Sequence, residues 1–425
     1  MPAIDADLQT AYAYTFPYYE MARQRFISSE VQRTPVNTFG HRRTLADHTA
    51  RAVTTPNNDT LYSSAWLDLS AGPIELTVPR IPAGRYWSMQ FMDASTSTVA
   101  LLGSRDEGDG DFKVWIARHG DTTDAPAGMR VLRLATRDVW MLGRIVVDGT
   151  HDLPAVQALQ DGLRLRAVKA GSAPAGPVAP AAPRGSPTDG GNYLAVVNDM
   201  LQRSGVPAAD QERLKRWSAF GIGVGSGAPT PEQGAALTAA LPELNASLRN
   251  GAQRAMNARV VQQWSYPDPA IGTFGTDHAL RATVALVGLA ALPPSEAIYL
   301  GAVPSHSDKP FHGSQRYRVR VPAQGIDAKA FWSLSMYQVE PDGRLFFVDN
   351  PIRRYAVGNR TPGLVKNADG SLDLYVQQQE PTEATQKANW LPAPAGLFRM
   401  TLRAYLPSAA MLKGEAPLPV VETLP

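Results

Sequence analysis

The chain has 425 residues, contains no cysteine, and carries 41 lysines and arginines against 39 aspartates and glutamates, a formal charge of +2. The length allows two or three domains, and the balanced charge gives no whole-chain field that would attract nucleic acid or an acidic membrane. The absence of cysteine excludes disulfides, thiolate nucleophiles, zinc–thiolate sites and iron–sulfur clusters.

The N-terminal residues 5–25 place aromatic and small side chains at helical spacing, which predicts a helix that Pro17 interrupts. The start has neither the basic region nor the apolar run of an export signal, so the sequence as it stands predicts a cytoplasmic protein. If a signal was removed, a periplasmic or secreted protein is expected instead. No apolar run approaches the length of a membrane span, so we expect no membrane partner.

Short apolar runs follow, separated by glycine, proline and aspartate, and this texture predicts an antiparallel sandwich or barrel. The predicted strands cover residues 64–70, 74–80, 85–93, 98–104, 112–118, 129–135 and 139–147. With the N-terminal helix they form the first expected domain, residues 1–150.

The next expected domain, residues 151–300, is a helical insertion. Its first helices are predicted over residues 153–168, 192–205 and 208–220. Residues 171–191 are rich in proline and glycine, and we interpret this segment as a loop that links the first two helices.

Two further helices are predicted in the insertion. Thr230, followed by a proline and a capping-box glutamine, predicts the N-cap of a long helix that runs towards Trp264 and that Pro242 kinks or splits. Another helix begins near Asp277 and ends before Pro293, which cannot continue it.

Strands resume in the last expected domain, residues 301–425. They are predicted over residues 316–322, 330–339, 344–350, 371–378 and 397–407. The sequences PAGRYWSMQFMD (82–93) and AKAFWSLSMYQ (328–338) repeat an aromatic, Trp, Ser pattern after a strand that ends in Val-Pro. This echo predicts two related β-sandwich units with helices inserted between them. The expected fold is therefore mainly β with a helical insertion (α+β), with two jelly-roll-like antiparallel sandwiches.

The stretch PNNDTLY gathers polar groups ahead of the first strand and allows two interpretations. Asparagine and aspartate after proline favour an Asx-turn that satisfies its own backbone. Alternatively, Asn57, Asn58, Asp59 and Tyr62 line a pocket mouth, where a carboxylate and a phenol divide acid and base roles. Asp59 is also able to bind a divalent cation through oxygen, which is the one cofactor that the sequence allows.

Histidines offer further candidates. His278 lies near the first turn of a predicted helix, where it either caps and packs or, if buried, acts as an acid or base. His306 and His312 lie six residues apart in a polar loop and are interpreted as solvated. The chain contains neither a GxSxG nor an HExxH motif, which argues against the familiar serine and zinc hydrolases.

The C-terminal strands concentrate arginine and aromatic residues. Arg353, Arg354 and Arg403 are able to clamp a carboxylate, with Tyr355 and Trp390 as walls. Subunit contacts are an equally good use for such residues, and both interpretations stay open.

Several of these motifs resemble two bacterial domains of unknown function. PNNDTLYSSAWLDL with GRYWSMQFMD resembles the family DUF1254, and FWSLSMYQ, NPIRRYAVGNR, DGSLDLYVQ and NWLPAPAGLFRMTLRAYLP resemble DUF1214. The resemblance implies two sandwich domains with jelly-roll-like cores, a helical insertion and a homo-oligomer. Many relatives carry an export signal, and at His278 the family usually has a tyrosine.

The residues that the resemblance carries over as typical are Asn57, Asp59, Thr60, Tyr62, Tyr86, Trp332, Tyr337, Asn350, Arg354, Tyr355, Asn389 and Trp390. The family supplies no agreed reaction. Presence of a typical residue therefore does not by itself imply catalysis.

These observations lead us to expect a cofactor-free hydrolase or lyase that acts on a small oxygenated or carboxylated molecule in a pocket between the sandwiches. Asp59 would be the base or a metal ligand, Tyr62 or His278 the acid, and Arg354 the anion clamp. The other expected substrate contacts are Asn57, Asn58, Tyr86, Tyr355 and Trp390. The alternative is a non-catalytic oligomeric scaffold that binds a ligand or polysaccharide.

Overall fold

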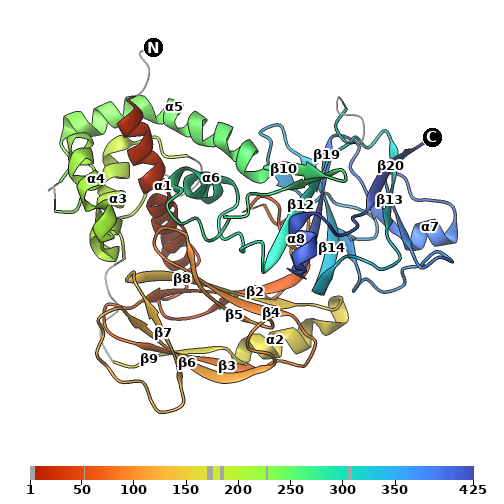
Figure 1. Cartoon of the computed structure of the whole chain (residues 1–425), viewed down its shortest axis with the longest axis horizontal. Helices are drawn as coiled ribbons and strands as arrows, with labels where there is room; N and C mark the ends of the chain where they lie inside the picture. Colours follow the sequence, from red (N-terminus) through yellow and green to blue (C-terminus); the bar gives the residue numbers. More distant parts are fainter. Residues whose placement is uncertain (1–4, 52, 170–175, 182–185, 226–227, 305–308) are drawn as a thin grey trace.

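The computed structural model describes residues 5–51, 53–169, 176–181, 186–225, 228–304 and 309–425. It comprises a helical body and two units built from paired β-sheets. In Figure 1 the helical body lies above the first β-unit, and the second β-unit lies to the right. The predicted class, mainly β with a helical insertion, is confirmed.

The helical body is assembled around the N-terminal helix. Its helices are α1 (Ala6–Phe26), α3 (Gly190–Ser204), α4 (Gln211–Trp217), α5 (Pro231–Met256) and α6 (His278–Val287). Helix α1 packs against α3, α5 and α6, and its aromatic side chains bury a shared core with them. In Figure 1, α5 extends from this body towards the second β-unit.

The helix starts that capping residues predicted are found in the structure, whereas the effects predicted for prolines inside helices are largely not. Thr230 and Gln233 form the predicted capping box of α5, and Asp277 caps α6 by accepting a hydrogen bond from the Leu280 amide. Pro17 and Pro242 lie inside α1 and α5, and both helices continue through them, so the predicted interruption at Pro17 and a split at Pro242 are wrong. Burial of the flanking helix faces in the common core offsets the backbone bond that each proline removes.

The first β-unit has two sheets, with strand orders β1-β2-β8-β4-β5 and β7-β6-β3-β9. The strands are β1 (Gly40–His41), β2 (Thr60–Asp68), β3 (Ile74–Arg80), β4 (Trp87–Met92), β5 (Thr98–Gly103), β6 (Gly110–Arg118), β7 (Arg130–Leu134), β8 (Asp138–Val146) and β9 (Arg164–Ala167). Apolar side chains that alternate along these strands fill the space between the sheets.

One prediction for this region is wrong. The helix expected over residues 153–168 ends at Gly162 as α2 (Leu153–Gly162), and residues 164–167 form β9 instead. This strand pairs with residues 74–77 of β3, so long-range backbone pairing overrides the helical pattern.

The second β-unit begins before the predicted boundary at residue 300. Its strand orders are β10-β11-β12-β19-β14-β15, with β16 also on β14, and β18-β17-β13-β20. The strands are β10 (Arg259–Val261), β11 (Trp264–Tyr266), β12 (Ala297–Ala302), β13 (Arg316–Val321), β14 (Ala328–Val339), β15 (Leu345–Phe346), β16 (Ala356–Gly358), β17 (Leu372–Gln377), β18 (Trp390–Pro392), β19 (Phe398–Pro407) and β20 (Val420–Leu424). Two short helices, α7 (Ala384–Ala388) and α8 (Ala409–Lys413), complete the unit.

The two β-units repeat one topology. The order β2-β8-β4 in the first unit corresponds to β12-β19-β14 in the second, and β7-β6-β3-β9 corresponds to β18-β17-β13-β20. Even the parallel pairing at one sheet edge recurs, in β6 with β7 and in β17 with β18. The strand order thus confirms the repeat that the sequence echo predicted.

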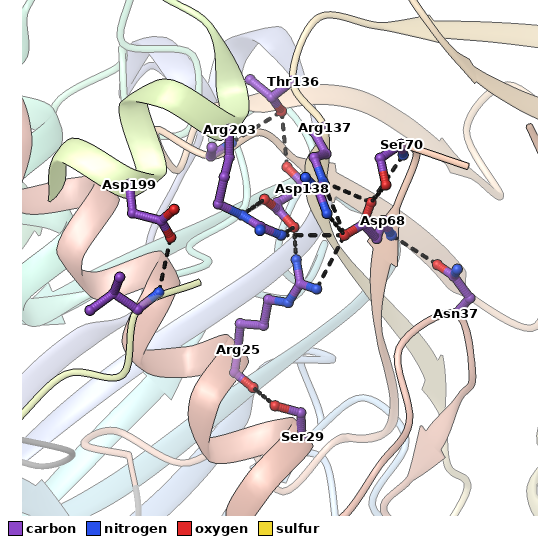
Figure 2. A network of polar contacts seen from close by, with 12 residues as sticks. Arg25, Ser29, Asn37, Asp68, Ser70, Thr136, Arg137, Asp138, Asp199 and Arg203 are labelled. Atoms are coloured by element: carbon purple, nitrogen blue, oxygen red, sulfur yellow. Dashed lines mark hydrogen bonds and ion pairs between the residues drawn. The ribbon is translucent and has the colours of Figure 1, made fainter. Parts of the chain in front are cut away.

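A buried ionic network fastens the helical body to the first unit (Figure 2). Asp68 and Asp138, register partners on β2 and β8, are fully buried. Asp68 accepts a 2.9 Å bond from Arg137, and Asp138 accepts a 2.8 Å bond from Arg203 of α3. Arg25 of α1 contacts both carboxylates. Burial would raise the pKa of Asp68, but bonds from Arg137 and neighbouring groups, with the Arg25 charge, lower it to about 2.

Candidate functional site

The repeat brings two equivalent rows of polar side chains to the junction of the β-units. In each unit the central strand carries an arginine whose register partners are a tyrosine on one side and a serine on the other. The rows are Tyr62–Arg144–Ser88 on β2-β8-β4 and Tyr299–Arg403–Ser333 on β12-β19-β14. An apolar cluster that includes Tyr86, Phe331 and Tyr405 joins the units beside these rows.

Arg144 is held across the junction by uncharged groups. Its guanidinium donates to the Gln90 side chain at 3.0 Å and to the Ala290 carbonyl at 2.9 Å. Ala290 belongs to the segment that leads into β12, and its backbone has a positive φ of 66°. Arg144 therefore reaches from the first unit to the entry of the second.

Arg403 makes the equivalent contacts from the second unit. Its guanidinium donates to the Ser335 hydroxyl at 2.6 Å and to the Thr55 carbonyl at 3.0 Å, with a longer bond to Pro56. Thr55 lies in the segment that leads into β2 and has a positive φ of 50°, which is strained for a β-branched residue. Each arginine thus fixes the chain that enters the other unit.

Neither arginine has an acidic ion-pair partner. Arg144 and Arg403 are both 4% exposed, and within the described ranges no carboxylate oxygen lies within 4.0 Å of either guanidinium. A buried cation requires a counter-charge or dense hydrogen bonding, because desolvation of an isolated charge is expensive. The junction is therefore a place where negative charge is favoured.

Tyr62 and Tyr405 share one donor at this place. The Asn57 side-chain amide donates to the Tyr62 hydroxyl oxygen at 3.1 Å and to the Tyr405 hydroxyl oxygen at 3.0 Å. The Arg144 guanidinium carbon lies 5.4 Å from the centre of the Tyr62 ring. Tyr62 and Asn57 keep partial exposure, whereas Tyr405 is fully buried.

The surroundings move the two phenols in opposite directions. Burial acts to raise the pKa of Tyr62, but Arg144, the Asn57 amide and Arg403 outweigh it, and the pKa lies below the ordinary value. For Tyr405 burial and the neighbouring Tyr299 and Tyr62 raise the pKa well above the ordinary value. A pair of titratable groups with separated pKa values is what acid–base chemistry requires.

Two carboxyl groups close the junction at equivalent positions. Asp59 immediately precedes β2 and accepts a 2.7 Å bond from Ser333 of the second unit. Glu296 immediately precedes β12 and accepts a 2.7 Å bond from Tyr86 of the first unit. Burial is the largest influence on both carboxyl groups and raises the pKa of each. These crossed bonds link the two units in both directions.

The stretch Asn57–Tyr62 forms the Asx-turn that one interpretation of the sequence predicted, and it also contributes side chains to the junction. The Asn57 side-chain oxygen accepts the Asp59 amide, which is an Asx-turn, while its amide nitrogen reaches Tyr62 and Tyr405. Asn58 instead donates to the Ala46 carbonyl. Among the candidate residues that the sequence suggested, the junction brings together Asn57, Asp59, Tyr62, Tyr86 and Arg403.

Other predicted site residues have contacts elsewhere. Arg354 donates to the carbonyl oxygens of Ala388 and Trp390 at 2.8 Å each, within the second unit. Tyr355 bonds to His48 and packs on Phe347. The Trp390 indole donates to the Gln377 carbonyl. These bonds support loops and strands of that unit.

The histidines are also placed away from the junction rows. His278 lies in the helical body, 2.8 Å from an Arg213 guanidinium nitrogen and edge-on to Tyr14. Burial, then Arg281, lowers the pKa of His278. His312 contacts Ser314, and His306 lies outside the described residues.

No set of three or more histidine, aspartate or glutamate side chains gathers as a metal-binding group in the described part of the chain. Asp59 has Ser333 as its hydrogen-bond partner. No helix within the described ranges is long and apolar enough to span a bilayer.

Two cavities lie outside the junction. One of about 560 Å³ borders the ionic network and is lined by Ser70, Arg118, His119, Arg137 and Arg203, among others. Another of about 490 Å³ lies between the N-terminal ends of α3 and α5.

Sequence reasoning missed Arg144, Tyr299 and Tyr405. The internal repeat held the missing signal. An acidic residue is followed three positions later by tyrosine in both units, at Asp59 and Tyr62 and again at Glu296 and Tyr299. Extending the internal repeat to this acidic-residue and tyrosine pair would have pointed to Tyr62 and Tyr299 together.

Comparisons with known proteins agree with this domain arrangement. Residues 36–167 match the model for a protein of unknown function, DUF1254, and residues 296–409 match the corresponding model DUF1214. The chain therefore contains a DUF1254 domain followed by a DUF1214 domain. The crystal structure of the VPA0106 protein from Vibrio parahaemolyticus is similar over 99% of each chain, with 24% identity and a TM-score of 0.75, which shows a shared fold.

A second solved structure, of an uncharacterised protein from Burkholderia cenocepacia, aligns over 98% of this protein and 88% of its own chain. Its identity is 14% and its TM-score 0.49. A comparison with curated proteins found no match. Both family descriptions read 'protein of unknown function'.

Proposed function

We propose that this protein is a hydrolase or lyase whose own side chains supply the acid–base groups, and that it acts on a small oxygenated or carboxylated molecule between the two β-units. One observation carries the proposal. Two buried guanidiniums without a carboxylate ion-pair partner flank a phenol whose pKa is lowered. A carboxylate or a developing oxyanion of a substrate supplies the negative charge that such a site favours.

Tyr62 is the proposed general base. A lowered pKa enlarges the phenolate fraction near neutral pH, which is the condition for a phenol to accept a proton. The Asn57 amide donates to the Tyr62 oxygen, a contact that favours the ionised form. Partial exposure leaves Tyr62 reachable from solvent.

Tyr405 is the proposed proton donor. Its raised pKa keeps the phenol protonated, and its oxygen bonds to the same Asn57 amide nitrogen as that of Tyr62. In this proposal the anion is bound by Arg403, one of the arginines that the sequence suggested as a carboxylate clamp, and by Arg144, in place of Arg354. Asp59, held by Ser333, orients the β2 entry and remains the second proposed base.

A conversion screen tests the proposal. Purified protein is incubated with a panel of small esters, lactones, hydroxy acids and unsaturated carboxylates, and products are followed by NMR. We expect at least one compound to be converted, with a fall of about 10²–10⁴-fold in Tyr62→Phe, the usual contribution of a general base.

The matched control is Tyr375→Phe, which removes a hydroxyl from β17 outside the junction. Full turnover by Tyr62→Phe would contradict the assignment. Saturable binding with no conversion of any compound would favour the alternative, a binding scaffold without chemistry.

A further inference from the structure

We infer that the ligand of the junction carries two anionic groups, one for each half of the internal repeat. This inference rests on the proposed function and names its substrate class, a small dianion such as a dicarboxylate.

The first step is the equivalence of the two arginines. Arg144 and Arg403 occupy corresponding register positions on the central strands β8 and β19. Each donates to a side chain on the neighbouring strand and to a backbone carbonyl in the segment entering the opposite unit. Because each of the two similar units contributes one cation, the junction contains two.

The second step is that both cations act on the same small volume. Arg144 and Arg403 each influence the pKa of Tyr62, and each also influences the pKa of Tyr299. The Arg144 guanidinium carbon lies 5.4 Å from the Tyr62 ring centre, and that of Arg403 lies 5.8 Å from the Tyr299 ring centre. Asn57 connects the halves by bonding to both Tyr62 and Tyr405. The repeat thus forms one site with two positive poles.

The third step is the supply of free donors. A guanidinium has five N–H groups. In the described part of the chain, Arg144 donates hydrogen bonds to Gln90 and Ala290 and also bonds to Tyr62. Arg403 donates to Ser335, Thr55 and Pro56 and also bonds to Tyr337. None of these acceptors is a carboxylate, and these contacts are fewer than the five N–H groups of each guanidinium, which leaves positive charge and a donor for an anionic ligand.

The halves are not identical, and the difference gives the ligand a direction. The first unit places Asn57 beside Tyr62, and at the corresponding place before Tyr299 the second unit has Pro294, which has no side-chain donor. Against the effect of burial, Arg144, the Asn57 amide and Arg403 lower the pKa of Tyr62, whereas burial raises that of Tyr299 to about 12. One anionic group therefore lies beside the reactive phenol, and the other serves as an anchor on the Arg403 side.

Isothermal titration calorimetry of the full chain tests the inference. The probes are straight-chain dicarboxylates of increasing length, each compared with the monocarboxylate of equal length. We expect one dicarboxylate to bind wild-type protein at least about tenfold more tightly than its monocarboxylate, the scale of one charge-assisted hydrogen bond.

Arg144→Gln and Arg403→Gln are each expected to reduce this preference to near unity, because either change removes one pole. Arg320→Gln, on β13 outside the junction, is the matched control and should keep the full preference. If a glutamine variant does not fold, Arg144→Lys and Arg403→Lys replace it. Because the ammonium cannot form the two-pronged bond, these variants are expected to lose part of the preference.

Equal binding of mono- and dicarboxylates by wild-type protein at every length would overturn the inference. So would an undiminished preference in the folded variants of either arginine. The experiments separate this inference from the proposed function. A strong dicarboxylate preference without turnover of any compound would support the two-pole site and contradict the proposed enzyme activity. Turnover of a monocarboxylate without any dicarboxylate preference would support the enzyme activity and contradict the two-pole site.

Discussion

Replacing Arg144 by glutamine should raise the pKa of Tyr62. The guanidinium carbon lies 5.4 Å from the ring centre. At an effective dielectric constant of ~20, two unit charges at that distance attract by about 3 kcal/mol, which corresponds to about 2 pKa units. Because Tyr62 is partly exposed, solvent screens some of this attraction, and we expect a shift of about 1–2 units.

The assay is a pH titration followed by the ultraviolet difference absorbance of tyrosinate. Subtracting the Tyr62→Phe titration from each curve isolates Tyr62 among the 14 tyrosines. The midpoint should move upward in Arg144→Gln and less in Arg403→Gln, whose charge has the weaker influence on Tyr62. Arg144→Lys, which keeps the charge, should lie close to wild type.

An unchanged Tyr62 midpoint in a folded Arg144→Gln protein would refute the electrostatic account. A second result would also refute the assignment of the lowered pKa to Tyr62. If Tyr62→Phe leaves the lowest tyrosine midpoint of the wild-type curve in place, the phenol with the lowered pKa is another residue.

Three further predictions concern stability. Asp138→Asn removes one of the two carboxylates that Arg25 and Arg203 contact in the ionic network. Urea unfolding should show a free energy of unfolding lower by about 3–5 kcal/mol. An unchanged unfolding midpoint would contradict the stabilising role of the network. Because the pKa of Asp68 is lowered to about 2 from about 3.9 in an unfolded chain, its stabilisation is complete above pH ~4 and disappears as the pH falls through 2. This amounts to about 2–3 kcal/mol, and Asp68→Asn should flatten the acid limb of the unfolding curve. Gly358→Ala forces a methyl group against the Trp332 carbonyl and should lower the melting temperature, whereas Gly396→Ala, which meets open space, should not.

The strands were predictable from sequence because their cause is local. Alternating apolar runs broken by glycine and aspartate recur at every predicted strand from residue 64 to 147, and each became a strand. Capping signals such as Thr230 and Asp277 likewise act within one turn of the helix that they start. Residues 164–167 were mispredicted because their conformation depends on β3, about ninety residues earlier.

Only part of the junction was predictable from the sequence, because some of its residues are brought there by contacts between distant segments. The PNNDTLY stretch is unusual in itself, and three of its polar residues reach the junction. Arg144 gave no such signal, because it lies in an ordinary strand sequence and its decisive contact, with Ala290, spans 146 residues. Arg354 is the converse case: its sequence neighbourhood is conspicuous, yet its guanidinium donates to two carbonyl groups within the second unit.

The most direct test of the two-pole junction is a crystal structure of the protein with the tightest-binding dicarboxylate. We predict ligand density in which one carboxylate contacts Arg144 near Tyr62 and the other contacts Arg403. Density confined to the cavity lined by Arg118, Arg137 and Arg203, with none between the two β-units, would contradict the account.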